Sequence, residues 1–288
     1  MSVLIHIGVT GWGDHDSIYP DTIRPSDKLK EYSAHFPAVE IDASFYAVQP
    51  ERNMRKWAEE TPSEFQFVVK AYQGMTGHER GEIPFETKTE MFEAFKLSLK
   101  PLIDAGKMAM VLFQFPPWFH CKKENVDYLR WCRQQMADLP CALEFRNQSW
   151  FQPDVKERTL SFMKEENWIH SICDEPQAGK WSIPAILEIA NPEKTLVRFH
   201  GRNVHGWNKT GNDHEWREVR YLYKYSTKEL KEWAQNLKDL SVKTKELFVL
   251  FNNNSGGDAA ENAQELIDLL GITYENLSPR QLSLLDFD

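Results

Sequence analysis

The sequence is poor in cysteine, and the few cysteines that it has lie far apart. There are four in 288 residues. They stand at positions 121, 132, 141 and 173, so no two of them have the close spacing of a zinc site. This spread also argues against a disulfide framework, and we expect no disulfide partner. A reducing, cytoplasmic compartment is the simplest expectation.

Long apolar runs and an excess of positive charge are also lacking. No apolar stretch approaches the roughly 20 residues that cross a bilayer, and no basic leader precedes the first apolar run. We therefore expect no membrane association. The formal net charge of −9 argues against binding of nucleic acid over the whole surface, although it is compatible with a local basic pocket.

Signature motifs of two large enzyme classes are missing as well. No glycine-rich dinucleotide fingerprint follows the first apolar run. No G-x-S-x-G motif marks a serine nucleophile, and no cysteine–histidine signature replaces it. The sequence therefore assigns no cofactor through a motif.

The sequence does contain a regular series of short runs rich in β-branched and aromatic residues. Runs of this length and composition predict strands. There are eight of them, at residues 4–10, 38–44, 66–72, 108–116, 141–147, 169–175, 195–201 and 247–254.

Amphipathic helical patterns separate most of these runs. One of them starts at a capping box formed by Ser226 and Glu229, and another ends at Gly271. Eight strand–helix units in a chain of this length predict a single TIM-like (β/α)8 barrel. The alternative is a doubly wound open sheet, which would need a reversal of strand order. We expect the barrel at residues 1–278, a tail at 279–288, and long loops after the third and seventh strands.

Alternate residues along the runs differ in polarity. One set is apolar, as Ile7 and Val9 are in the first run, and the other set carries polar groups. Because successive side chains point to opposite faces of a strand, the polar set should face the barrel axis. It lies near the carboxyl ends of the strands, where barrel enzymes hold their active sites. Its members are Glu40, Asp42, Lys70, Gln114, Glu144, Arg146, Asp174, Arg198, His200 and Asn252.

The sixth run fits this alternation least well, because Ser171 and Cys173 would then face outward. Unpaired charges inside the barrel would cost several kcal/mol each, so they must pair with one another or with a ligand. A purely structural network is the alternative to a ligand site. It would join Glu40 to Arg198, or Glu144 to Lys70.

Several segments together resemble the YecE-like family, also called domain of unknown function 72. They are GVTGWGDHDSIYP, VEIDASFY, WAEETPSEFQFVVKAYQGMTG, LFQFPP, ALEFRNQSWF, VRFHGRN and LFNNN, and they cover nearly the whole chain. The resemblance implies a single TIM-barrel-like domain and a site, but no particular reaction. Asp42 stands where much of the family has asparagine, so the resemblance implies no fixed charge at that position.

The cations of the polar set favour an anionic ligand, because a guanidinium binds phosphate or carboxylate in a planar, two-point contact. Our leading hypothesis is an enzyme that binds a phosphorylated small molecule or a nucleotide. Glu144 and His200 would transfer protons, with Asp174 as their partner. We expect Glu144 to face protein and Arg146 to face the ligand. The residues expected to contact the ligand are Trp12, Glu40, Lys70, Gln114, Arg146, Arg198, Arg202 and Asn252.

A divalent metal site is a competing hypothesis. As residue types, the set of Glu40, Glu144, Asp174 and His200 resembles the ligands of metal-dependent barrel isomerases and nucleases. The lysine and arginine side chains between them disfavour a dication at the same place.

A non-catalytic binding module is the other alternative, and it depends on the tail. Residues 281–285 (QLSLL), from Gln281 to Leu285, resemble the peptide with which bacterial proteins dock on the DNA sliding clamp. Such docking would connect the protein with DNA replication or repair. The competing interpretation is a tail that packs on the floor of the barrel.

Overall fold

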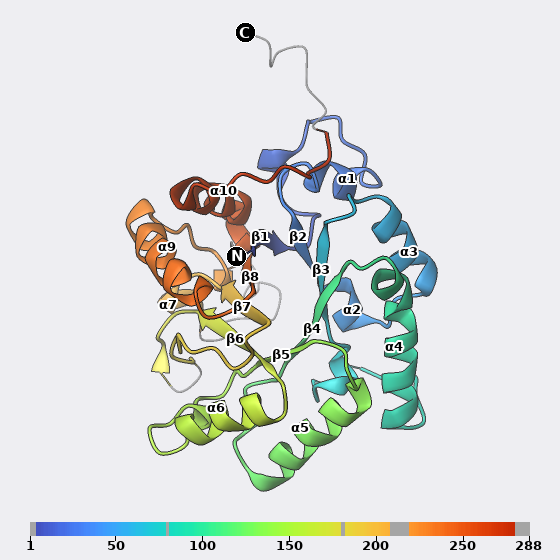
Figure 1. The fold of residues 1–288 in the computed structure, drawn as a ribbon, viewed down its shortest axis with the longest axis vertical. Coiled ribbons are helices and arrows are strands. Elements are labelled where there is room, and N and C mark those ends of the chain that lie inside the picture. The colour runs from blue at the N-terminus through green and yellow to red at the C-terminus, as the bar shows by residue number, and fades with distance from the viewer. Residues whose placement is uncertain (1–3, 79–80, 180–181, 208–218, 280–288) are drawn as a thin grey trace.

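A computed structural model describes residues 4–78, 81–179, 182–207 and 219–279 of the chain. Eight strands of this part close into a parallel barrel in chain order (Figure 1). The barrel closes because β1 (Leu4–Thr10) pairs with both β2 (Ala38–Ile41) and β8 (Glu246–Phe251), which excludes the open sheet. The others are β3 (Gln66–Lys70), β4 (Met108–Gln114), β5 (Cys141–Glu144), β6 (Ile169–Asp174) and β7 (Lys194–Phe199). The predicted TIM-like barrel is confirmed.

Helices cover the outside of the barrel (Figure 1). The longer ones are α3 (Glu51–Glu59), α4 (Lys88–Asp104), α5 (Lys123–Met136), α6 (Lys156–Glu165), α9 (Thr227–Ser241) and α10 (Asp258–Leu270). The short ones are α1 (Lys28–Tyr32), α2 (Ala43–Tyr46) and α7 (Val204–Trp207). Single 3-10 turns are η1 (Asp16–Ile18), η2 (Gln73–Met75), η3 (Gln148–Trp150) and η5 (Asn254–Gly256).

The helix ends follow the local signals of the sequence. Ser226 and Glu229 form the predicted capping box of α9. Gly271 ends α10 in the left-handed region, with φ of 67°. The alternation of strand and helix breaks once, because the described residues between β6 and β7 contain no α-helix. Among the helices described, none combines the length and the apolar character that a bilayer crossing requires.

The barrel interior is apolar at depth and charged near the mouth. The predicted apolar set, with Val9 and Phe199 among its members, packs between the strands and the helices. A second apolar cluster consists of side chains of the opposite parity and of Ala109, which lies at a register shift between β3 and β4. Its members are Ala38, Val68, Ala109, Met110, Leu112, Ala142, Ile169, Leu196, Phe248 and Leu250. Toward the carboxyl ends of the strands the inward-facing side chains are polar, so the buried charges lie where they can contact one another.

Two tyrosine hydroxyls complete the hydrogen bonding of β1. Tyr32 of α1 accepts from the backbone N–H of Val9 at 2.9 Å and donates to the carbonyl of Ala38 at 2.8 Å, so it stands between β1 and β2. Tyr274, beyond α10, accepts from the N–H of Ile7 at 3.1 Å and donates to the carbonyl oxygen two residues earlier at 2.9 Å. These hydroxyls satisfy backbone groups that no neighbouring strand reaches.

The backbone of β2, together with the tyrosine between β1 and β2, leaves no room for a side chain at Gly8. A Cβ atom there would lie 1.9 Å from the carbonyl oxygen of Ala38 and 2.9 Å from the Tyr32 hydroxyl. We expect Gly8→Ala to lower the free energy of unfolding by about 1–3 kcal/mol, because the strands must separate. Gly13→Ala is the matched control, since a Cβ atom at Gly13 meets nothing within 4 Å. Equal urea-unfolding midpoints for the two variants would contradict this account.

Candidate functional site

The predicted inward residues gather at the carboxyl ends of the strands. Eight of them form a group that we call the mouth cluster: Glu40, Lys70, Gln114, Glu144, Arg146, Arg198, His200 and Asn252. Five lie on the strands themselves, and the other three follow the last residue of a strand by one or two positions. The alternation of the strands therefore brings together side chains that are up to about two hundred residues apart in sequence.

Glu144 is the centre of the mouth cluster. Its Oε1 accepts from Gln114 at 2.6 Å and from Arg146 at 2.8 Å, and its Oε2 accepts from Arg198 at 2.9 Å and from Ser171 at 3.1 Å. Burial alone would raise the pKa of Glu144, but the guanidiniums of Arg198 and Arg146 outweigh burial and hold that pKa well below its usual range. Glu144 is therefore ionised and has no free oxygen, which argues against the predicted role in proton transfer.

Glu40 and Arg198 form a two-point ion pair that is fully buried. Arg198 donates to the two carboxylate oxygens of Glu40 at 2.9 and 2.7 Å, and neither side chain has any exposed surface. Burial raises the pKa of Glu40 to about 7, although Arg198 opposes this shift. The structural pairing of these two residues is thus present. The alternative pairing of Glu144 with Lys70 is wrong, because Lys70 binds Asp42 at 3.1 Å.

Glu175 belongs to the same layer and was missed by the sequence analysis. Arg146 donates to its Oε2 at 2.5 Å, and the backbone N–H of Ile183 donates to its Oε1 at 2.6 Å. Burial raises the pKa of Glu175 to about 7. Arg146 is only 5 % exposed and is held by Glu175 and Glu144, so the expectation that its guanidinium faces the ligand is not supported.

The parity predicted for the sixth strand is wrong. Neighbouring residues of parallel strands point to the same face, and Cys173 pairs with the inward Arg198 while Asp174 pairs with the outward Phe199. Shifting the alternation by one residue would have found the inward positions at Ser171, Cys173 and Glu175. The charge of Asp174 led to the wrong assignment, because a charged side chain was expected to face the barrel axis.

Asp174 and Arg202 form a separate pair outside the mouth cluster. The guanidinium of Arg202 donates to Asp174 at 2.9 Å and to Glu229 of α9 at 3.1 Å. Burial raises the pKa of Asp174. Asp174 therefore does not orient His200, and Arg202 connects a strand end to a helix start. Neither residue keeps the role at the ligand that we predicted.

His200 lies between the guanidiniums and Asn252. Its Nε2 is 2.9 Å from Arg146 and 3.4 Å from Glu144, and its Nδ1 is 3.0 Å from the side-chain amide of Asn252. Burial lowers the pKa of His200 well below its usual value, and the guanidiniums of Arg146 and Arg198 lower it further. The imidazole is therefore neutral at physiological pH.

Lys70 is the cation of the mouth cluster that keeps the most exposed surface. Its side chain is 15 % exposed, and its Nζ lies 4.9 Å above the ring of Phe45. Burial alone would lower the pKa of Lys70, but Asp42 and Glu40 outweigh burial and raise it, so the amine keeps its charge. Trp12, the predicted stacking residue, packs edge-on against Trp57 with ring centroids 5.2 Å apart.

Part of the long connection after β7 lies beside the mouth cluster. The ring of Tyr221 is 6.1 Å from that of His200, and Arg146 lies 5.7 Å from the ring of Trp207. Arg220 stacks on both aromatic residues, at 4.4 Å from Trp207 and 5.2 Å from Tyr221. We predicted only that this loop opens onto the site. The aromatic and basic stretch VRYLYKY was the available signal for these residues.

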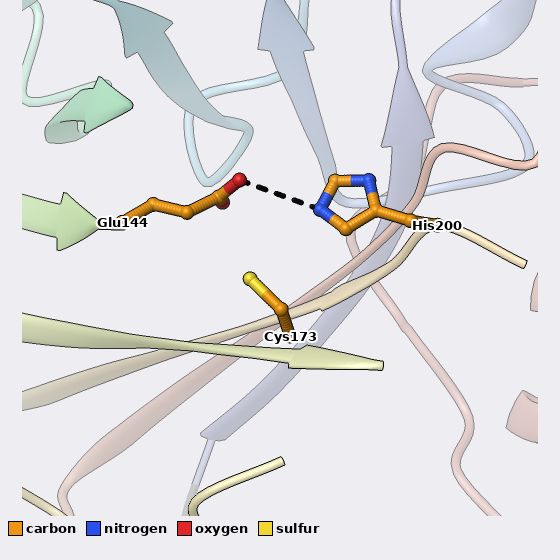
Figure 2. A group of neighbouring side chains, drawn as sticks. All are labelled: Glu144, Cys173 and His200. Atoms are coloured by element: carbon orange, nitrogen blue, oxygen red, sulfur yellow. Dashed lines mark ion pairs between the residues drawn. The ribbon is translucent and has the colours of Figure 1, made fainter. Parts of the chain in front are cut away.

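Glu144, Cys173 and His200 form a group whose ligand atoms all lie within 4.8 Å of one another (Figure 2). All three are buried, and Figure 2 shows Glu144 and His200 facing each other, with Cys173 directed at them from β6. A divalent cation does not fit here. Two guanidiniums already occupy the oxygens of Glu144, and Arg146 lies at the Nε2 atom of His200. The predicted four-residue metal set does not assemble either, because Asp174 points away.

The sliding-clamp peptide predicted at residues 281–285 lies outside the described residues and stays a prediction. The described chain runs to residue 279, and Ser278 is tied to Ser33 through hydrogen bonds of 3.0 and 2.8 Å.

The closed barrel and its charged mouth define a TIM-like (β/α)8 protein. The chain belongs to the DUF72 family, because the model described as "Protein of unknown function DUF72" matches residues 6–283. The chain is 63 % identical over 281 residues to the UPF0759 protein YunF of Bacillus subtilis (strain 168), which covers 98 % of this chain and 100 % of the relative. The family resemblance drawn from the sequence is confirmed.

Solved structures of the family have the same fold. A DUF72 family protein from Enterococcus faecalis V583 is 40 % identical, with a TM-score of 0.90 over 97 % of this chain and 100 % of that one. A DUF72 family protein from Thermotoga maritima MSB8 is 30 % identical, with a TM-score of 0.79 over 93 % of this chain and all of the other.

Proposed function

We propose that the mouth cluster binds a small anionic ligand, such as a phosphorylated molecule, and that the protein is an enzyme acting on this ligand. The observation that carries the proposal is the position of Lys70. It is a charged amine at the open end of the barrel, above a layer in which guanidiniums already hold the carboxylates. An anion arriving at Lys70 therefore competes with Asp42 for the amine, while the carboxylates below are already held by guanidiniums.

Two properties of the cluster support catalysis over simple structural pairing. Strongly shifted pKa values gather at functional sites, and here the pKa values of Glu40, Glu144, His200 and the adjacent Glu175 are all shifted. The cluster also lies at the face of the barrel where enzymes of this fold act. In this proposal Glu144 and the buried, neutral His200 hold Arg146 in place instead of exchanging protons with the ligand directly.

The test is anion binding measured by thermal shift and calorimetry with inorganic phosphate and sulfate. We expect both anions to raise the melting temperature of the wild type. Lys70→Met should weaken binding by about tenfold or more, because a charge-assisted contact contributes about 1.5–3 kcal/mol. Lys100→Met is the matched control, since Lys100 lies on α4, is 59 % exposed and pairs with Asp104.

The outcomes separate the hypotheses. If neither anion stabilises the wild type, or if Lys70→Met responds as the control does, the proposal is wrong. Binding that depends on Lys70, with no turnover of any phosphorylated compound, would favour the non-catalytic binding module.

A further inference from the structure

Tyr221 is a phenol beside the mouth cluster, and the proposed function leaves it without a role. Its ring lies 6.1 Å from that of His200 and is stacked by Arg220 at 5.2 Å. Unlike His200, the residue is only partly buried. Tyr221 is therefore adjacent to the buried layer and still accessible to a ligand at the mouth.

The buried carboxyl groups are unable to meet a ligand. Glu144 accepts hydrogen bonds at both oxygens, and Glu40 is bound at both oxygens by Arg198. Glu175 is bound by Arg146 and by the backbone N–H of Ile183. All three carboxyl groups are at most 2 % exposed. None of them can pass a proton to a ligand directly.

The other titratable groups of the mouth are poor proton donors. His200 is fully buried and neutral, and burial raises the pKa of the Cys173 thiol well above its usual value. Lys70 keeps its proton because Asp42 stabilises the charged amine, and Asp42 is held in that ion pair at 3.1 Å. Among the described residues of the mouth, Tyr221 is the acidic group that is both accessible to a ligand and able to donate a proton.

We propose that the Tyr221 hydroxyl is the proton donor of the mouth cluster, opposite the neutral imidazole of His200. The inference rests on the proposed function, because it needs an anionic ligand at Lys70. In the transfer, the O–H bond of Tyr221 breaks and an O–H bond forms on an oxygen of the ligand. The phenolate that remains is stabilised by the surrounding cations, and it recovers its proton from water when the ligand leaves.

The charges that face Tyr221 support this role. Burial alone would raise the pKa of Tyr221, but nearby cations outweigh burial and lower that pKa below its ordinary value. The cations are Arg220 beside it, Arg146 after β5, Lys70 on β3 and Arg198 on β7. The carboxyl groups in the same layer, which oppose this shift, are Glu40, Asp42, Glu144 and Glu175. They are paired with these cations, and the net effect on the phenol still favours its ionised form.

The first measurement is a titration of tyrosinate absorbance in the full chain. We expect the wild type to show one ionisation below the ordinary tyrosine pKa of about 10, and Tyr221→Phe to lack it. Tyr223→Phe is the matched control, because burial raises the pKa of Tyr223 to about 12 and its hydroxyl donates to Glu229. The control should keep the early step. Identical curves for the wild type and Tyr221→Phe would overturn the proposal.

The second measurement links the phenol to the anion and needs no variant. Inorganic phosphate should move the early step of the wild type to higher pH, because an anion near Tyr221 favours the protonated phenol. Calorimetry should accordingly show proton uptake when phosphate binds near pH 9. This pH is about one unit below the ordinary tyrosine pKa. Phosphate binding without any shift or uptake overturns the role of Tyr221 alone. No phosphate binding at all overturns the proposed function, and this role with it.

Discussion

Replacing Arg198 by methionine is expected to lower the free energy of unfolding by about 3–5 kcal/mol. Arg198 has no exposed surface and donates to the carboxylates of Glu40 and Glu144. Its removal leaves two buried carboxyl groups short of their main partner, and a buried charge without a partner is costly. The measurement is urea unfolding followed by tryptophan fluorescence at neutral pH.

Two further variants separate lost charge from lost packing. Arg130→Met removes the partner of Glu166 at the surface, where Arg130 is 47 % exposed, and should cost less than about 1 kcal/mol. Adding Glu40→Gln to Arg198→Met should recover part of the loss, since it removes one of the two stranded charges. A loss for Arg198→Met no greater than that for Arg130→Met would mean that the buried pairs add little to the stability of the barrel.

Acidification is expected to destabilise the protein through His6. The imidazole stacks on Phe248 of β8 with centroids 4.5 Å apart, and its Nε2 is 3.7 Å from Glu246. Burial lowers the pKa of His6 to about 4, while Glu246 opposes this shift. The unfolded chain takes up the proton first, at its ordinary pKa of about 6.5. The stability that the neutral imidazole provides is therefore complete above about pH 6.5 and is lost as the pH falls toward 4.

The size of this effect is measured as a difference between two proteins. Between about pH 7 and about pH 4, the wild type should lose up to about 3 kcal/mol more than His6→Gln, because each pH unit of pKa shift corresponds to about 1.4 kcal/mol. Using the difference removes the contributions of Glu40 and Glu175, whose raised pKa values act in the opposite direction. Parallel pH profiles for the two proteins would rule out His6 as the source.

Strand periodicity was sufficient to predict the barrel and most of its charged interior. Glu40, Glu144 and Arg198 lie on the axis because the alternation of a strand is strict once one face is known. The same rule failed in the sixth strand, where both faces are buried. There the charge of Asp174 suggested that its side chain faces the axis. Its pairing with the outward Phe199 of β7 shows that the side chain faces outward.

The chemistry of the site was harder to predict than its location. Whether burial or neighbouring cations control the pKa of Glu144 depends on distances that sequence does not contain, and here the two guanidiniums prevail. The positions of residues in the connections between strands and helices could not be predicted from strand periodicity at all. Tyr221 and Arg220 lie beside the mouth cluster through tertiary packing, which no local sequence pattern predicts.

The tyrosine hydroxyl at Ile7 has a consequence for synthesis of the chain on the ribosome. The N–H of Ile7 in the first strand donates to Tyr274, which is made 267 residues later. The pairing of this strand with β8 is also unavailable until the chain is nearly finished. Until then one edge of β1 is exposed, and an open strand edge can join other chains. Closure of this barrel is therefore a late event, and a nascent chain that stops before Tyr274 lacks the last contact that protects its own beginning.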